Sequence, residues 1–183
     1  MPITKDSFYS NRTAHDWSDQ MAFSLYFFKE NSLIETLLYS LKYRENKKIG
    51  LFLGQKLGGS VAEAGLHFDG IIGVPLHPIR RIKRGYNQVD LIGSAAAIVL
   101  NIPYYSKAVR RKKHTPALSK TKKSRTKLMA DAFKLNKKVR LSKGHYLLID
   151  DIFTTGATLN SCLKLLQKEK GISLSIGVIA CRN

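Results

Sequence analysis

Two adjacent carboxylates follow a short apolar run in the segment YLLIDDIFTTGATL, which spans Tyr146 to Leu159. The carboxylates belong to Asp150 and Asp151, and a small loop rich in hydroxyl groups comes next: Thr154, Thr155, Gly156, Ala157 and Thr158. Gly156 permits a tight turn, and backbone N–H groups at the start of a following helix attract phosphate. Carboxylates repel phosphate but accept hydrogen bonds from hydroxyl groups. A sugar phosphate would suit both halves, with its phosphate on the loop and its ribose diol on the aspartates.

Other roles for the same residues stay open on spacing alone. Asp150 and Asp151 could form a strand-end turn and a helix cap, or the acidic pair could hold Mg²⁺, which takes oxygen ligands. A P-loop is excluded because the chain has no GxxxxGK[ST] pattern.

Alternating strands and helices would position this segment. Strands are predicted at residues 22–30, 68–77, 144–150 and 172–182, with short strands within 102–110 and 130–136. Helices are predicted at residues 32–45, 48–64 and 88–100, and from Gly156 to a C-cap at Gly171. This alternation predicts a parallel sheet with helices on both faces, and ligands then bind at the carboxyl ends of the strands.

Details of composition refine these elements. Ser32 and Glu35 have the spacing of a capping box, and Gly58 and Gly59 are expected to weaken the second helix. Alanines at 95–97 would let the third helix pack closely on the sheet. Residues 78–88 and most of 107–143 are predicted to be basic loops.

Length and charge bound the function. The 183 residues fit a single domain, divided into an N-terminal hood-like helical region at about 1–65 and a core with the ligand site at about 66–183. The formal net charge of +18 favours a polyanionic partner such as nucleic acid or a phosphorylated metabolite. No apolar run has the length of a membrane span. The two cysteines, Cys162 and Cys181, are expected to be reduced thiols in a cytoplasmic protein.

The whole stretch LLIDDIFTTGATL resembles the signature of type I phosphoribosyltransferases, which bind phosphoribosyl pyrophosphate. That signature consists of four apolar residues, two acids, two variable residues and a Thr/Ser-Thr-Gly-x-Thr loop, and every position matches. The resemblance implies the type I phosphoribosyltransferase fold, an α/β fold with a central parallel sheet flanked by helices and a small N-terminal hood. It also implies that Asp150 and Asp151 hold the ribose, and that Thr154 to Thr158 hold the 5′-phosphate.

A second segment, GVPLHPIRRIKRGYNQ at Gly73 to Gln88, is similar to the ComF family, which is linked to competence and DNA uptake. Two departures stand out. Many members begin with a cysteine-rich segment that this sequence lacks, and the usual Gln of the basic loop is replaced, with Lys120 nearest its place. The loop, Arg110 to Arg125, corresponds to the flexible loop that covers the substrate in phosphoribosyltransferases. Its divergence favours ligand binding over turnover.

The resemblance also implies a site for pyrophosphate after Pro75. Leu76 and His77 would offer backbone N–H groups there, while Arg81 and Arg84 would offer charge. Mg²⁺ would be the cofactor, held mainly through the ligand with Asp150 and Asp151 as further candidates. Asn87 and Gln88 could bind ligand or cap the following helix.

Two functions from different classes follow. One is a phosphoribosyltransferase that transfers the phosphoribosyl group from phosphoribosyl pyrophosphate to an unknown nucleophile. The other is an accessory protein or regulator of the same fold, without turnover, that binds single-stranded DNA. In both cases a ribose phosphate is the expected ligand, a homodimer is a candidate assembly, and no membrane insertion is expected.

Overall fold

Five strands form one central sheet in the computed structural model, which describes residues 21–44, 46–112 and 132–182. Their order across the sheet is β1 (Ala22–Phe28), β7 (Ile172–Arg182), β6 (Gly144–Phe153), β2 (Gly70–Gly73) and β3 (Tyr104–Tyr105). All neighbouring strands run parallel, so their carboxyl ends meet at one edge of the sheet. The predicted parallel sheet is confirmed.

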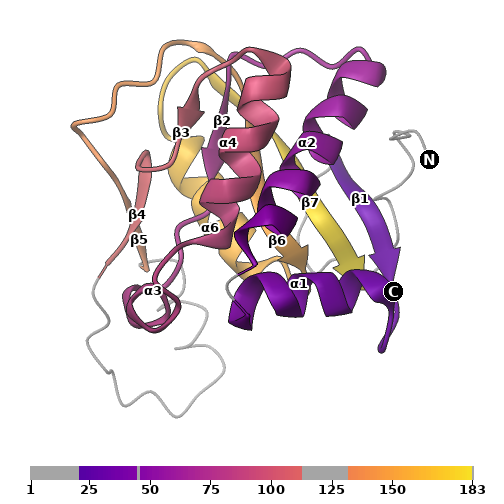
Figure 1. Ribbon diagram of the computed structural model, residues 1–183. Helices are drawn as coiled ribbons and strands as arrows, with labels where there is room; N and C mark the ends of the chain where they lie inside the picture. Colours follow the sequence, from indigo (N-terminus) through magenta and orange to yellow (C-terminus); the bar gives the residue numbers. More distant parts are fainter. Residues whose placement is uncertain (1–20, 45, 113–131, 183) are drawn as a thin grey trace.

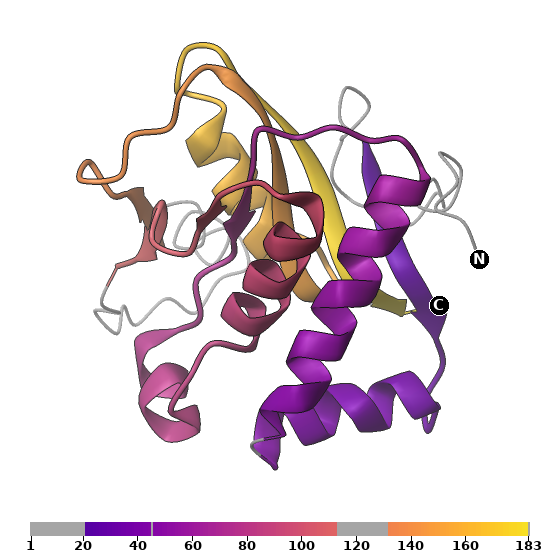
Figure 2. The same ribbon diagram turned by 45° about the horizontal axis from the view of Figure 1, so that its top comes forward.

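Helices cover both faces of this sheet (Figure 1). The helices α2 (Lys47–Glu63) and α4 (Gln88–Leu100) lie on one face, and α6 (Ala157–Leu166) lies on the other (Figure 2). A further helix, α1 (Leu33–Tyr43), crosses the carboxyl ends of the strands (Figure 1). None of the helices in the described residues has the length and apolar character of a membrane span.

The central strand β6 shows how the sequence builds two cores. Leu147 and Ile149 belong to the apolar cluster under α2 and α4, whereas Tyr146 and Leu148 belong to the cluster under α6. Successive residues of a strand point to opposite faces, so a continuous apolar run is buried on both sides. The same alternation continues into the two aspartates that follow.

The helix α1 begins as the capping-box spacing predicts. Ser32 is the N-cap, and its hydroxyl accepts a hydrogen bond from the Glu35 backbone N–H at 3.4 Å. The Glu35 carboxylate reaches back to the N–H of Asn31, at 2.7 Å, one residue before the N-cap. The helices α1, α2 and α4 and the strand β7 all lie within two residues of their predicted bounds.

Glycines on α2 form a packing surface. A Cβ atom added at Gly50, Gly54 or Gly58 would collide with α4, whereas one at Gly59 would meet nothing within 4 Å. These collisions involve Ala95 and the backbone of Ala96, so these two alanines contact α2. The Ala95 side chain therefore faces the glycine row of α2, whereas Ala96 and Ala97 belong to the apolar cluster that includes Leu147 and Ile149 of the sheet.

Residues 78–84 form a helix, α3 (Pro78–Arg84), and the predicted loop is wrong here. Pro78 occupies the first turn, where its missing N–H costs nothing. The His77 side chain caps this turn by accepting from the Ile79 N–H at 3.3 Å, and Gly85 ends the helix at φ 75°. No residue of α3 is buried, which is why an apolar periodicity did not reveal it.

The C-cap predicted at Gly171 is also wrong. The helix α6 ends at Leu166, and Gln167 is its C-cap. Gly171 has φ 82° and precedes β7, where a side chain would collide with Lys143. The glycine therefore serves the turn into the strand.

A small antiparallel pair stands apart from the main sheet. The predicted strand at 102–110 divides into β3 and β4 (Val109–Arg111), and β4 pairs with β5 (Phe133–Leu135). Phe133 packs into the core under α6, so the pair is fixed to the domain. Most of the loop predicted at Arg110 to Arg125 lies outside the described residues.

Candidate functional site

The two aspartates lie where the central strand outruns its neighbour. The strand β2 ends at Gly73, which pairs with Ile149, and β6 continues beside β7 through Asp150 and Asp151 to Phe153. The strand predicted to end at residue 150 is therefore longer, and the carboxylates lie within it. They still lie at the carboxyl edge of the sheet, where open α/β sheets bind ligands.

Asp151 is held on the face of the sheet that carries α4. Its carboxylate is 2.8 Å from the Lys42 ammonium group and 2.9 Å from the Gln88 side-chain nitrogen, both at oxygen Oδ2. The other oxygen, Oδ1, accepts the backbone N–H of Ile152 at 2.8 Å. Asp151 is only 6% exposed, so it ties α1, α4 and β6 together in a buried network.

Asp150 has a different environment on the opposite side of the strand. Its Oδ1 accepts the backbone N–H of Asp151 at 2.9 Å, and its carboxylate borders the same cavity. Burial raises the pKa of Asp150 well above its usual range, and the charge of Asp151 raises it further. The Asp150 charge also contributes to a raised pKa of the Cys162 thiol on α6, after burial as the main cause. Asp150 is thus the carboxyl group with acceptor capacity left for a ligand.

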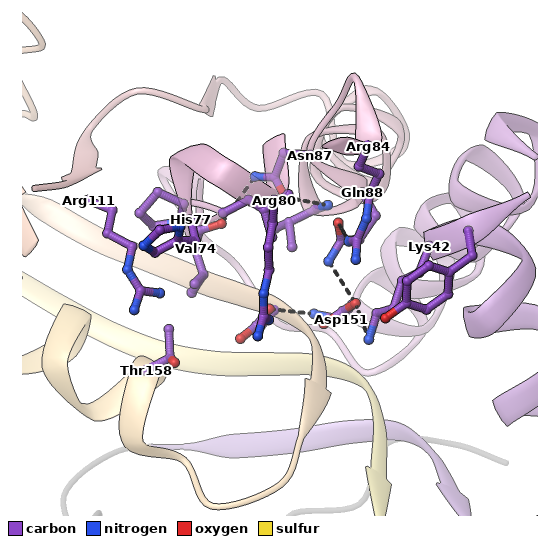
Figure 3. A pocket seen from close by; sticks show the side chains of 15 residues that line it. Lys42, Val74, His77, Arg80, Arg84, Asn87, Gln88, Arg111, Asp151 and Thr158 are labelled. Atoms are coloured by element: carbon purple, nitrogen blue, oxygen red, sulfur yellow. Dashed lines mark hydrogen bonds and ion pairs between the residues drawn. The ribbon is translucent and has the colours of Figure 1, made fainter. Parts of the chain in front are cut away.

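One cavity joins these carboxylates to a set of cations (Figure 3). Of the predicted site residues, it contains Leu76, His77, Arg84, Asp150, Asp151 and Thr158. Residues that the sequence analysis did not assign to the site also line it: Lys42, Tyr43, Arg80 and Arg111.

Some predicted residues lie elsewhere. Arg81 lines a neighbouring hollow with Asp90 and Lys107. Thr154 and Thr155 are exposed, and Gly156 has φ 69°, as a tight turn requires. Of the loop from Thr154 to Thr158, only Thr158 borders the cavity. The assignment of the loop to phosphate stays a prediction.

Arginines gather at one end of the cavity. Burial lowers the pKa of Arg111, the positive charge of Arg80 lowers it further, and both side chains line the cavity. Arg111 also lies over the Phe133 ring, 5.3 Å from its centroid. Among the described residues neither arginine forms an ion pair, since the salt bridge found there joins Lys42 to Asp151. Two guanidinium groups that line one cavity and form no ion pair within the described residues suit an anion such as phosphate.

The other end of the cavity lies against α1. Arg84 donates a hydrogen bond to the Gln88 side-chain oxygen and lies over the Tyr43 ring, 5.5 Å from its centroid. Figure 3 shows Arg84, Gln88, Asp151 and Lys42 as one chain of contacts. Within the region predicted as a hood, α1 therefore borders the site, while β1 and α2 belong to the sheet and its covering layer.

Asn87 and Gln88, which the sequence allowed either to cap a helix or to bind ligand, have different roles in the structure. Asn87 caps α4, since its side-chain oxygen accepts the Val89 N–H at 3.3 Å, and its amide donates to the Val74 carbonyl at 3.2 Å. Gln88 instead links Arg84 to Asp151. Both side chains are buried, so each takes part in a fixed network.

Comparison with solved structures identifies the fold of the chain. Adenine phosphoribosyltransferase from Leishmania tarentolae superposes with a TM-score of 0.51 at 12% identity, over 87% of this chain and 91% of that one. At this identity the likeness concerns the fold. The chain has the type I phosphoribosyltransferase fold, a central parallel sheet flanked by helices, as predicted.

Proteins of similar sequence show which phosphoribosyltransferase-fold proteins the chain resembles. Competence protein F from Haemophilus influenzae is 39% identical over 106 residues, 55% of this chain and 44% of that protein. The DNA utilization protein YhgH of Escherichia coli strain K12 is 28% identical over 81% of this chain and 67% of that protein. No family model matches the chain. The match spans less than half the length of competence protein F. These homologues confirm the resemblance to the ComF family. The chain is a phosphoribosyltransferase-like protein related to competence proteins.

Proposed function

We propose that this protein binds phosphoribosyl pyrophosphate together with Mg²⁺ in the cavity between α1, α3 and α6. The observation that carries the proposal is one cavity with two kinds of group. Carboxylates at the end of β6 accept hydrogen bonds from hydroxyls, and Arg80 and Arg111 beside them attract phosphoryl groups. A ligand that carries both a diol and several phosphoryl groups matches this pairing.

The contacts suggest how such a ligand would lie. The ribose diol would donate to Asp150, because Asp151 already accepts three hydrogen bonds or charge contacts. The 5′-phosphate would lie at the N-terminus of α6, near Thr158. The pyrophosphate would then lie against Leu76, His77, Arg80 and Arg111.

The residues fit Mg²⁺ in its usual protein setting. No group of three or more potential metal ligands occurs within residues 21–44, 46–112 and 132–182. Mg²⁺ commonly keeps several waters and binds one or two carboxylates plus substrate phosphates, and Asp150 is a carboxylate with acceptor capacity at the cavity. When bound, the ion would supply charge that stabilises the leaving pyrophosphate.

If transfer occurs, the chain's own groups have defined tasks. The bond between the anomeric carbon and the pyrophosphate oxygen breaks, and pyrophosphate leaves with the bonding electrons. The acceptor donates a lone pair to form the new bond at that carbon. Positive charge that develops on the ribose would be stabilised by Asp150 and Asp151, and negative charge on pyrophosphate by Arg80 and Arg111.

Isothermal titration of phosphoribosyl pyrophosphate with Mg²⁺ tests the proposal. The wild type should bind saturably, and Asp150→Asn should weaken binding roughly 10- to 100-fold, because it removes a charged acceptor for the ribose hydroxyls. Glu63→Gln is the matched control, since this exposed acid on α2 lies away from the cavity. Absence of binding by folded wild type would contradict the proposal, as would equal affinities of wild type and Asp150→Asn.

A second candidate function is binding of single-stranded DNA, and one surface feature favours it. Tyr39 and Tyr43 form an exposed ring pair on α1 with centroids 4.8 Å apart, and Arg84 lies over Tyr43. Exposed aromatic rings beside cations are the usual platform for unpaired bases. The whole chain's charge of +18 would add a salt-dependent contribution.

Binding of a fluorescent oligothymidylate, followed by anisotropy at several salt concentrations, tests this second function. Tyr39→Ala should weaken binding about 10-fold, because one stacking contact is lost, and affinity should fall steeply with salt. Phe52→Ala removes an aromatic side chain of similar exposure on α2 and should leave the affinity unchanged. Equal losses in both variants would exclude α1 as the platform.

A further inference from the structure

The α1 end of the cavity is not occupied by any part of the ligand placed above. The ribose and phosphoryl groups use Asp150, Thr158, Arg80 and Arg111, whereas this end is built from the last turns of α1 and α3 and the first turn of α4. Lys42 and Gln88 contact Asp151 there, and Arg84 donates a hydrogen bond to Gln88 (Figure 3). A group that attacks the ribose from this side would meet these side chains first.

This end of the cavity carries an excess of positive charge. Lys42 pairs with Asp151 at 2.8 Å, and that salt bridge neutralises one charge of each sign. Arg84 has no carboxylate partner in the described part of the chain, where its contacts are the neutral Gln88 amide and the Tyr43 ring. Within residues 21–44, 46–112 and 132–182, one guanidinium charge is therefore left without a counter-ion.

The Arg84 guanidinium is also fixed in orientation. Stacking on an aromatic ring and a hydrogen bond to a buried amide both restrict the side chain. A planar guanidinium held in this way has further N–H donors for a two-point contact with a carboxylate or phosphate. A cationic amine would be repelled by the same group, and a neutral ring would leave its charge unmatched.

From this arrangement we infer that the second ligand, the acceptor, carries an acidic group that Arg84 binds. The inference rests on the proposed binding of a ribose phosphate, and it names the class of its partner: a nucleophile with a carboxylate or phosphate, such as an acidic heterocycle. Lys42 is a positioning residue here, because its contact with Asp151 holds α1 against the site. Arg84 is the residue that sets specificity for the acid.

Matched pairs of acidic and neutral rings test this inference. Nicotinate with nicotinamide, and orotate with uracil, are titrated into protein saturated with ribose 5-phosphate and Mg²⁺, which has no pyrophosphate to lose and so cannot react. In the wild type the acid should bind roughly 10- to 100-fold more tightly than its neutral partner in at least one pair. In Arg84→Gln that ratio should fall to about one.

The ratio within each variant removes any general effect of a substitution on affinity. Lys83→Gln is the control, since Lys83 is exposed on the same helix and does not line the cavity, and it should keep the wild-type ratio. Lack of binding by both acids, a wild-type ratio near one, or a preference that survives in Arg84→Gln would each overturn the inference.

The same titrations on ligand-free protein separate this inference from the proposed function. If ribose 5-phosphate does not bind, the proposed ribose phosphate site fails. An acid preference that persists in the ligand-free protein and is lost in Arg84→Gln would still uphold an anion site at α1. Binding of ribose 5-phosphate without any acid preference would uphold the ribose phosphate site and overturn the acid-binding role of Arg84.

Discussion

Gly54→Ala is expected to lower the free energy of unfolding by about 3 kcal/mol, at the upper end of the usual cost of overpacking a core. A Cβ atom at this position would lie 2.7 Å from the Ala95 Cβ and would also overlap the Ile92 carbonyl oxygen. The obstacle is α4 backbone, which no side-chain rotation can relieve. The two helices must separate, and every contact along their interface then weakens.

Gly59→Ala is the matched control in the same helix. It introduces the same methyl group, but nothing lies within 4 Å of the new atom. Because alanine is more stable than glycine in a helix interior, the free energy of unfolding of this variant should rise by about 1 kcal/mol. Urea unfolding of both variants gives the two free energies, and a similar value for the two would contradict the proposed role of the glycine row.

The glycine row illustrates what the sequence could and could not predict. Hydrophobic periodicity located α1, α2 and α4 within about a turn, since each buries an apolar face. The same reading treated Gly58 as a weakness, because helix propensity scores a residue without its neighbours. Gly50, Gly54 and Gly58 recur every four residues, and this spacing was a usable signal for close packing against another helix.

The helix α3 was missed for a related reason. It buries no residue, so it has no apolar stripe, and its basic composition suggested a loop. Pro78 at its start and Gly85 at its end were nevertheless the usual boundary signals of a helix. These two local signals were sufficient to predict α3, but the absence of an apolar stripe was given more weight.

The candidate site was predictable where it is local in sequence. The segment from Asp150 to Thr158 carries its own turn and helix start, so its position could be inferred directly. The place of Lys42 could not be inferred, because this residue reaches the cavity through tertiary packing of distant elements. A lysine on an amphipathic helix ordinarily faces solvent, and only the structure places Lys42 against Asp151.

The adjacent aspartates are expected to respond in opposite directions to the same substitution. Asp151→Asn should lower the free energy of unfolding by about 2 kcal/mol, as removal of one partner leaves buried donors without an acceptor. Lys42, Gln88 and the Ile152 N–H approach both oxygens of this carboxylate. An amide has one acceptor oxygen, so either orientation turns its NH₂ group towards a donor.

Asp150→Asn should instead leave stability unchanged or raise it at neutral pH. Its amide oxygen can keep the hydrogen bond from the Asp151 N–H, and the substitution removes the repulsion between two neighbouring charges. Loss of ligand binding without loss of stability would then mark Asp150 as a ligand residue. Loss of stability with Asp151→Asn would mark that residue as the structural link to α1.

The pH dependence supplies the decisive control. Burial and the charge of Asp151 raise the pKa of Asp150 in the folded protein, so the folded state binds this proton more tightly than the unfolded state. The contribution of Asp150 to the stability of the wild type should therefore fall as pH rises from the ordinary carboxyl pKa, about 4, through the raised pKa. Any gain from Asp150→Asn should therefore be absent near about pH 4, grow as pH rises and be complete above the raised pKa. Urea unfolding across this range measures it, and a gain that is independent of pH would show that the charge of Asp150 is not its cause.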